Sequence, residues 1–286
     1  MTDENSPEKQ QHGRWGFLGH PFVIAALSSI TAIIVAVLTL SSQSDSTPDP
    51  KLDQKTQGDI AFRVEPDFEF YEEGWRVAFD GPLPDTAQYP RTPTGGYVPK
   101  FKWAKTRGAI EIGESHLRLY LQNNGTERVT IRAVSAQVTE RIEPLAQTYM
   151  EAPSAGVNEI IHLEFDLDSG DVVPAIKGTA DGSAPSAGAK PFFSTRNVTL
   201  DPDETTDFRL TAKSTRCLCK YRFELEIVKV DSTLKLEVGD SAGRPFVITG
   251  PAQSYVDRWM DGGLACQRPS IVRAEADGTA DCQSRP

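Results

Sequence analysis

The spacing of apolar residues divides this chain into two parts. An uncharged apolar run extends from Phe22 to Leu40. As a helix that rises ~1.5 Å per residue, this run would span the ~30 Å hydrocarbon core of a bilayer. We therefore predict one N-terminal transmembrane helix at residues 22–41, preceded by a short cytoplasmic tail at residues 1–21. The run is longer than that of a secretory signal, which favours an uncleaved signal-anchor.

Beyond the apolar run, the pattern first becomes polar and then alternates. Residues 42–59 consist mostly of Ser, Thr, Pro, Asp and Gln, a composition typical of a disordered linker. Apolar residues then recur at every second position from Leu117 to Leu121, and Asn123-Asn124-Gly125 follows. This pattern predicts a strand, a turn and a second strand that contains Val129 and Ile131, which together would form a hairpin.

The same alternation recurs downstream. Its clearest segments are residues 161–168, 217–227, 234–238 and 246–248. Several short strands separated by turn residues, with little helical periodicity, indicate a mainly β protein. We predict an antiparallel immunoglobulin-like β-sandwich that forms an extracytoplasmic domain at residues 60–250.

The two flanks of this domain are less regular. Prolines interrupt the aromatic-rich stretch at residues 61–107, so we expect it to supply edge strands or to wrap around the sandwich. Residues 251–286 carry two of the four cysteines, and we predict a disulfide-containing C-terminal tail. The only plausible helix outside the membrane lies at residues 252–260.

Charge and cysteine content restrict the environment and the partners. The net charge is -10 and the pI is about 5.0, which opposes binding to nucleic acid. Positive charges on the two sides of the apolar run are balanced, so they do not decide its orientation. An even number of cysteines favours an oxidising compartment, so we place the large domain outside the cell membrane.

Gly239-Asp240-Ser241-Ala242-Gly243 fits the G-x-S-x-G pattern of many hydrolases. In those enzymes the serine lies on a turn from a strand into a helix, whereas the residues that follow here predict a strand. A serine protease site also needs a placed histidine. The sequence outside the membrane offers His116 and His162, both on the polar side of an alternating strand. We therefore interpret this stretch as a turn between two strands and assign no catalytic residue.

Acidic residues suggest a possible metal site. His162, Glu164, Asp166 and Asp168 alternate on one face of a predicted strand, and oxygen ligands of this kind suit a hard cation. Alternate residues on a strand lie ~6.5 to 7 Å apart and cannot surround one ion unless a loop folds back. We favour a solvated acidic face over a calcium site. The sequence contains no recognisable cofactor motif, so we assign no cofactor and no metal ligand.

The cysteines allow several interpretations. Cys217 and Cys219 belong to a predicted strand, whereas a redox-active pair is usually C-x-x-C at the start of a helix. Zinc bound by Cys217, Cys219, Cys266 and Cys282 is an alternative, but an external location favours disulfides. Two bridges from the tail to the sandwich and a local Cys217–Cys219 bridge remain equally open.

Five segments together resemble a group of actinobacterial single-pass membrane proteins of uncharacterised function. They are RGAIEIGESHLRLYLQNNGTERVTI, IIHLEFDLDSG, NVTLDPDETTDFRLTA, CLCKYRFELEIV and LEVGDSAGRPFVITG, within residues 107–250. The resemblance implies a β-sandwich outside the cell membrane and brings no reaction and no site residues.

Two classes of function follow from the sequence. The first is a non-catalytic, membrane-anchored surface module that binds a cell-envelope protein or a glycan through loops or an edge strand. The second is an envelope hydrolase that uses Ser241 or a metal-dependent acidic face around Glu164 and Asp166. We favour the first, because no catalytic constellation is recognisable and a sandwich on a flexible linker suits presentation to a partner.

Overall fold

The computed structural model describes residues 55–72, 74–90, 96–152, 162–177, 190–262, 271–275 and 279–283. All of them belong to the compact unit Asp53–Pro286. The predicted tail at residues 1–21, the predicted transmembrane helix at residues 22–41 and linker residues 42–54 lie outside the described residues. Within the described ranges, no helix is long and apolar enough to cross a membrane.

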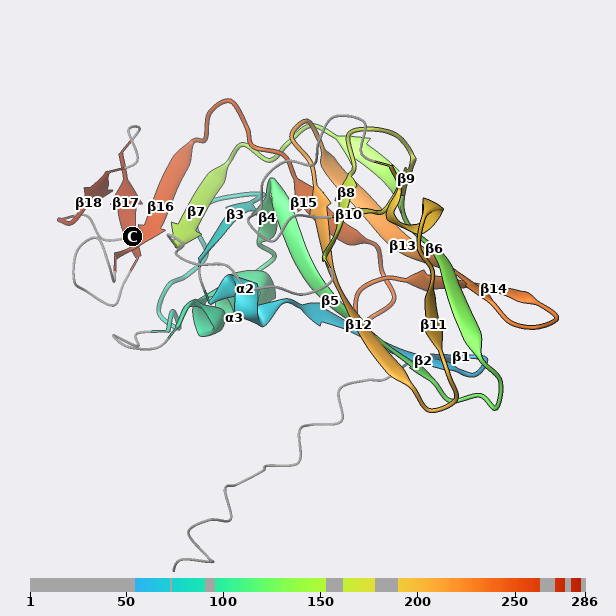
Figure 1. Cartoon of the computed structure of the whole chain (residues 1–286). Helices are drawn as coiled ribbons and strands as arrows, with labels where there is room; N and C mark the ends of the chain where they lie inside the picture. Colours follow the sequence, from blue (N-terminus) through green and yellow to red (C-terminus); the bar gives the residue numbers. More distant parts are fainter. Residues whose placement is uncertain are drawn as a thin grey trace, which may run out of the picture. The chain divides into compact units, whose positions relative to one another are not determined.

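The described chain is mainly β and forms two mixed sheets (Figure 1). The first sheet has six strands in the order β1-β2-β5-β12-β8-β10. Their bounds are Lys55–Gln57 for β1, Ile60–Pro66 for β2, Glu114–Asn123 for β5, Thr205–Lys213 for β12, His162–Asp166 for β8 and Ile176–Lys177 for β10. Strand β1 pairs with β2, so the sheet begins within the segment predicted as a linker.

The second sheet has twelve strands, ten of them in the order β11-β6-β13-β15-β4-β3-β7-β16-β17-β18, while β14 pairs with β13 and β9 with β6. The bounds are Val198–Leu200 for β11, Val129–Ile142 for β6, Leu218–Val228 for β13, Phe246–Thr249 for β15, Ile110–Ile112 for β4, Trp75–Phe79 for β3, Thr148–Ala152 for β7, Asp257–Asp261 for β16, Ile271–Ala274 for β17, Ala280–Asp281 for β18, Thr233–Val238 for β14 and Val172–Pro174 for β9.

The first sheet packs against the β6–β13 half of the second sheet, as in a β-sandwich. Strand β13 turns Cys219, Tyr221, Phe223, Leu225 and Ile227 into the shared core, which confirms the predicted alternation. Across the core, the ring of Phe165 on β8 lies 4.9 Å from the ring of Phe223, centroid to centroid. Burial of these two apolar faces is the main force that holds the layers together.

A second core lies under the other half of the second sheet. The short helix α2 (Phe68–Tyr71) and the helix α3 (Tyr97–Thr106) pack there against β3 and β7. The rings of Tyr71 and Phe101 stack with centroids 3.8 Å apart. Pro99 fits in the first turn of α3, where its missing N–H group costs nothing. The aromatic-rich stretch therefore supplies helices as well as strands, and its strands β2 and β3 each have a neighbour on both sides, so the predicted edge strands are wrong. The 3₁₀ turn η1 (Phe192–Ser194) lies elsewhere.

Two predictions about the sheets are wrong: the pairing of one hairpin and the antiparallel direction of all strands. Strands β5 and β6 belong to different sheets, so the turn at Asn123–Gly125 is an arch between the layers and not a hairpin. The buried Asn123 side chain supports this arch by donating to the carbonyl oxygens of Glu127 at 2.8 Å and Leu200 at 3.2 Å. The sandwich is also not purely antiparallel, because β12–β8, β15–β4 and β16–β7 are parallel pairs.

The C-terminal segment is part of the sheet. Residues 252–260, predicted as a helix, contain most of β16, which pairs with β7 on one side and β17 on the other. Trp259 and Met260 follow Val256 at helical spacing, but sheet partners are available on both sides and the strand forms instead. Residues 251–286, predicted as a tail, thus contribute β16, β17 and β18 to the second sheet (Figure 1).

Candidate functional site

A cavity of about 280 Å³ lies where α2, β3, β4, β5 and β7 meet. Gly113 separates β4 from β5 and has φ +79°. This glycine passes the chain from the second sheet to the first, so Glu111 and Glu114 reach the same cavity from different sheets. The lining residues are Phe70, Tyr71, Gly74, Trp75, Arg76, Glu111, Ile112, Glu114, His116, Glu151 and Ala152. We define this cavity as the β3–β5 pocket.

Glu111 forms the most firmly held polar part of the β3–β5 pocket. Its Oε1 accepts hydrogen bonds from Tyr71 Oη at 3.1 Å and Ser115 Oγ at 3.2 Å, and its Oε2 is paired with Lys105 Nζ. Burial, followed by the charge of Glu111, raises the pKa of Tyr71, so the phenol stays protonated and donates. This network fixes the Glu111 carboxylate, which is 4% exposed as a residue.

His116 is held between the pocket and the outer face of the first sheet. Its ring stacks on Phe70, and its Nε2 lies 3.3 Å from Glu114 Oε2. Its Nδ1 lies 3.0 Å from Thr211 Oγ1, which lies 2.5 Å from His162 Nε2. Thr211 Oγ1 thus links the rings of His116 and His162 in one chain of polar contacts. Thr211 is fully buried, so these polar contacts orient the His116 ring and expose no nucleophile.

The β3–β5 pocket carries more negative than positive charge. The hydrogen bond with His116, opposed by burial, lowers the pKa of Glu114 to about 2, so this carboxylate is ionised at neutral pH. On the other side, Arg76 on β3 pairs in register with Glu151 on β7. Glu151 accepts a hydrogen bond from Tyr149 Oη, whose pKa is raised by burial. Three carboxylates and one guanidinium therefore surround a partly aromatic cavity.

Ser241 lies at the surface, away from this pocket. The predicted strand-to-strand connection is confirmed, but it is not a hairpin, because β14 and β15 pair in turn with the same edge of β13. Residues 239–245 form an excursion opposite Arg222, whose Nη1 donates to the carbonyl oxygen of Gly243 at 2.6 Å. The Asp240 carboxylate accepts from the backbone N–H of Arg244 at 2.8 Å. His116 and His162 bond Thr211 in the other sheet and lie apart from Ser241.

The predicted acidic face divides into three environments. Glu164 is buried, and its Oε2 lies 3.0 Å from Lys213 Nζ, so it does not lie on a solvated face. Asp166 is exposed at the end of β8. Asp168 lies in the turn after β8 and accepts hydrogen bonds from the Thr215 N–H and Oγ1, both at 2.7 Å. The structure therefore does not bring the four predicted residues together.

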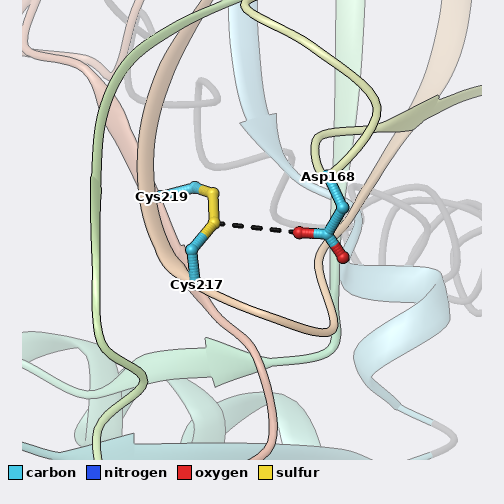
Figure 2. Close-up of side chains that lie close together, drawn as sticks. All are labelled: Asp168, Cys217 and Cys219. Carbon is cyan, nitrogen blue, oxygen red and sulfur yellow. Dashed lines mark hydrogen bonds between the residues drawn. A yellow bond between two sulfur atoms is a disulfide. The ribbon is translucent and has the colours of Figure 1, made fainter.

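The cysteine pair forms a local disulfide. Cys217 and Cys219 are bonded to each other, with their Cα atoms 5.4 Å apart, and Asp168 faces them (Figure 2). Cys217 precedes the first residue of β13, so the bridge does not lie within a regular strand. Cys282 is also disulfide-bonded. Cys266 lies outside the described residues. The structure thus has the local bridge, one of the two possibilities that the sequence left open.

Sequence reasoning did not find the β3–β5 pocket. Its residues come from five elements, and Glu111 and Glu151 lie in strands that were not predicted. One signal was present: the aromatic residues Phe70, Tyr71 and Trp75 gather in a segment that also contains several charges. Without the sheet order, nothing in the sequence connects that segment with β7.

Comparisons with known proteins bring no identification. No protein-family model and no curated protein matches this chain. Similar solved structures include the crystal structure of a Bordetella pertussis protein provisionally named ApaA. It is 10% identical and covers 68% of this chain and 96% of its own, with a TM-score of 0.25. A likeness of this size carries no argument about fold or function.

Proposed function

We propose that this chain is a membrane-anchored, extracytoplasmic binding protein whose β3–β5 pocket holds a small organic cation. The observation that carries the proposal is the pocket itself, in which Glu111, Glu114 and Glu151 outnumber Arg76 beside the aromatic side chains of Phe70 and Trp75. Aromatic faces and carboxylates both attract a cationic amine. Lys105 offsets part of the Glu111 charge, and Lys213, whose Nζ lies 3.7 Å from Glu114 Oε1, offsets part of the Glu114 charge.

The location is a second part of the proposal. The apolar run at Phe22–Leu40 supports a single-pass anchor, and the disulfide between Cys217 and Cys219 supports an oxidising, extracytoplasmic compartment. Two packed sheets are consistent with an immunoglobulin-like sandwich and with membership in the actinobacterial group that the sequence resembles. A domain tethered outside the membrane meets glycans and proteins of the envelope, and amino sugars among them carry suitable amines.

The test is a binding experiment with two matched probes. Glucosamine and N-acetylglucosamine share a ring, but only glucosamine carries a cationic amine. We expect glucosamine to bind the full chain in detergent, measured by saturation-transfer NMR, and N-acetylglucosamine to bind at least tenfold more weakly. The reason is that the acetyl group removes the charge that Glu114 and Glu151 attract.

Variants connect the binding with the pocket. Glu114→Gln and Glu151→Gln should each weaken glucosamine binding, whereas Glu127→Gln, which changes an exposed residue in the arch after β5, should leave it unchanged. Equal binding of both probes, no binding of either, or equal binding by all three variants would contradict an organic-cation pocket. The hydrolase alternative gains no support from the described residues, because Ser241 is exposed and both histidines bond Thr211.

A further inference from the structure

A second group of chemically reactive side chains lies at the end of the sandwich, where the turn after β8 meets the turn between β12 and β13. One ligand atom each from Asp168, Cys217 and Cys219 lies within 4.8 Å of the others. Figure 2 shows the Asp168 carboxylate pointing at the sulfur of Cys217, and the Oδ1–Sγ distance is 3.8 Å. Both cysteines are buried, with exposures of 5% and 0%.

Ser214 supplies a fourth polar atom to this group. Its Oγ lies 3.0 Å from Asp168 Oδ1, 3.3 Å from Cys217 Sγ and 3.9 Å from Cys219 Sγ. Zinc–sulfur and zinc–oxygen bonds of ~2.3 Å and ~2.0 to 2.2 Å place the ligand atoms of a tetrahedral site roughly 3.3 to 3.9 Å apart. Four of the separations, from 3.0 to 3.9 Å, are therefore close to those of a zinc site, whereas the two sulfurs are bonded to each other and must separate first.

The carboxylate of Asp168 is oriented in the way that metal-binding carboxylates usually are. Its Oδ2 accepts the two hydrogen bonds from Thr215, which leaves Oδ1 directed toward the sulfurs. Hydrogen bonds of this kind fix ligand orientation in known metal centres.

The disulfide alone accounts poorly for this arrangement. A bridge between residues two positions apart closes a very short loop, and the entropic contribution of a disulfide to stability is smaller for a shorter loop. The Asp168 carboxylate holds the 214–217 turn through Thr215 and Ser214, and its Oδ1 also lies beside the Cys217 sulfur. After reduction, however, the same carboxylate would attract a cation, and a thiophilic cation would bind the two thiolates.

We propose that reduction of the Cys217–Cys219 disulfide creates a site for one zinc ion, bound by the two thiolates and Asp168 Oδ1, with Ser214 Oγ or a water molecule as the fourth ligand. A phosphine reductant breaks the S–S bond with two electrons. Water supplies the two thiol protons and the oxygen of the resulting phosphine oxide. Zinc then displaces the two protons from the thiols. The oxidised chain lacks the thiolates and does not bind zinc at this site.

The experiment uses the full chain with Cys266→Ser and Cys282→Ser, so that Cys217 and Cys219 are the only remaining cysteines. The protein is reduced with a phosphine, freed of the reductant without oxygen, and titrated with Zn²⁺ against a chromophoric chelator. We expect one zinc ion per reduced chain and none per oxidised chain. Equal zinc binding by the two forms, or no binding by the reduced form, would overturn the proposal.

Two further measurements identify the ligands. Asp168→Asn should weaken zinc binding by the reduced chain at least tenfold, whereas Asp231→Asn, at an exposed turn, should have no effect. Unchanged affinity in Asp168→Asn would exclude the carboxylate as a ligand. Asp168 also organises the 214–217 turn, so Asp168→Asn can fail to fold. In that case the absorption spectrum of the reduced Cys266→Ser, Cys282→Ser chain with Co²⁺ provides the test. Tetrahedral thiolate ligation gives intense visible bands and a thiolate–cobalt charge-transfer band. The absence of these bands would overturn the proposal.

Discussion

At the residue scale, the glycines of the 239–245 excursion contribute more to stability than its serine. A Cβ atom at Gly239 would overlap the carbonyl oxygen of Arg244 and lie 2.9 Å from Arg222 Nη1. The backbone oxygen cannot move without breaking its hydrogen bond from the Asp240 N–H, which is 2.8 Å long. We therefore expect Gly239→Ala to lower the free energy of unfolding by about 2 kcal/mol, the usual cost of overpacking. Urea unfolding followed by tryptophan fluorescence measures this change.

Two controls separate this steric effect from other causes. Ser241→Ala changes an exposed side chain, and Gly170→Ala adds a Cβ that meets no atom within 4 Å. Each should change the free energy of unfolding by less than about 0.5 kcal/mol. A Gly239→Ala variant as stable as these two would show that the excursion rearranges freely. A large loss in Ser241→Ala would show that the serine has partners that an exposed turn does not provide.

At the element scale, the sequence predicts individual strands well and their partners poorly. Alternation identifies the core face of β13, because the period of two depends only on the residues within one strand. Pairing depends on the rest of the chain. Leu117–Leu121 and Val129–Ile131 point into one core from opposite sheets, and their pattern is the same as that of a hairpin. Strand β16 was missed for a related reason, since its partner β7 is remote in sequence.

Strand β9 offers a direct test of an element that the sequence did not predict. Val173 pairs with Ala136 on β6 and is 3% exposed, whereas its neighbour Val172 is 62% exposed. Val173→Ala removes two buried methyl groups and should lower the free energy of unfolding by about 2 kcal/mol. Val172→Ala should change it by less than about 0.5 kcal/mol. Equal effects in urea unfolding would mean that β9 does not face the core as described.

At the scale of the whole molecule, the β3–β5 pocket shows why a site escapes sequence reasoning. Glu111 and Glu114 lie close in sequence, yet they reach the pocket from different sheets because Gly113 changes the direction of the chain. Glu151 joins them only because β7 pairs with β3. The Cys217–Cys219 pair was recognisable from spacing, but the approach of Asp168 depends on the parallel pairing of β8 with β12. Long-range sheet order therefore determines both sites.

Long-range order also depends on one buried ion pair between α3 and β16. Lys100 Nζ lies 2.5 Å from Asp261 Oδ2, and the two side chains are 4% and 1% exposed. Tyr89 Oη donates to the same oxygen at 3.0 Å. Replacing Asp261 by Asn leaves the ammonium of Lys100 buried without its counter-charge, which usually costs about 3 to 5 kcal/mol.

We therefore expect Asp261→Asn to lower the free energy of unfolding by about 3 kcal/mol, measured by urea unfolding of the full chain. Adding Lys100→Met should recover part of this loss, because no unpaired charge then remains buried. Glu140→Gln breaks an exposed ion pair with Lys220, in which the side chains of Glu140 and Lys220 are 45% and 42% exposed. This control should lower the free energy of unfolding by less than about 0.5 kcal/mol. Two results would contradict this interpretation: a loss of unfolding free energy in Asp261→Asn no larger than in Glu140→Gln, or a double variant whose loss equals the sum of the losses of Asp261→Asn and Lys100→Met. Either result would mean that β16 is not fixed to α3 by a buried charge pair.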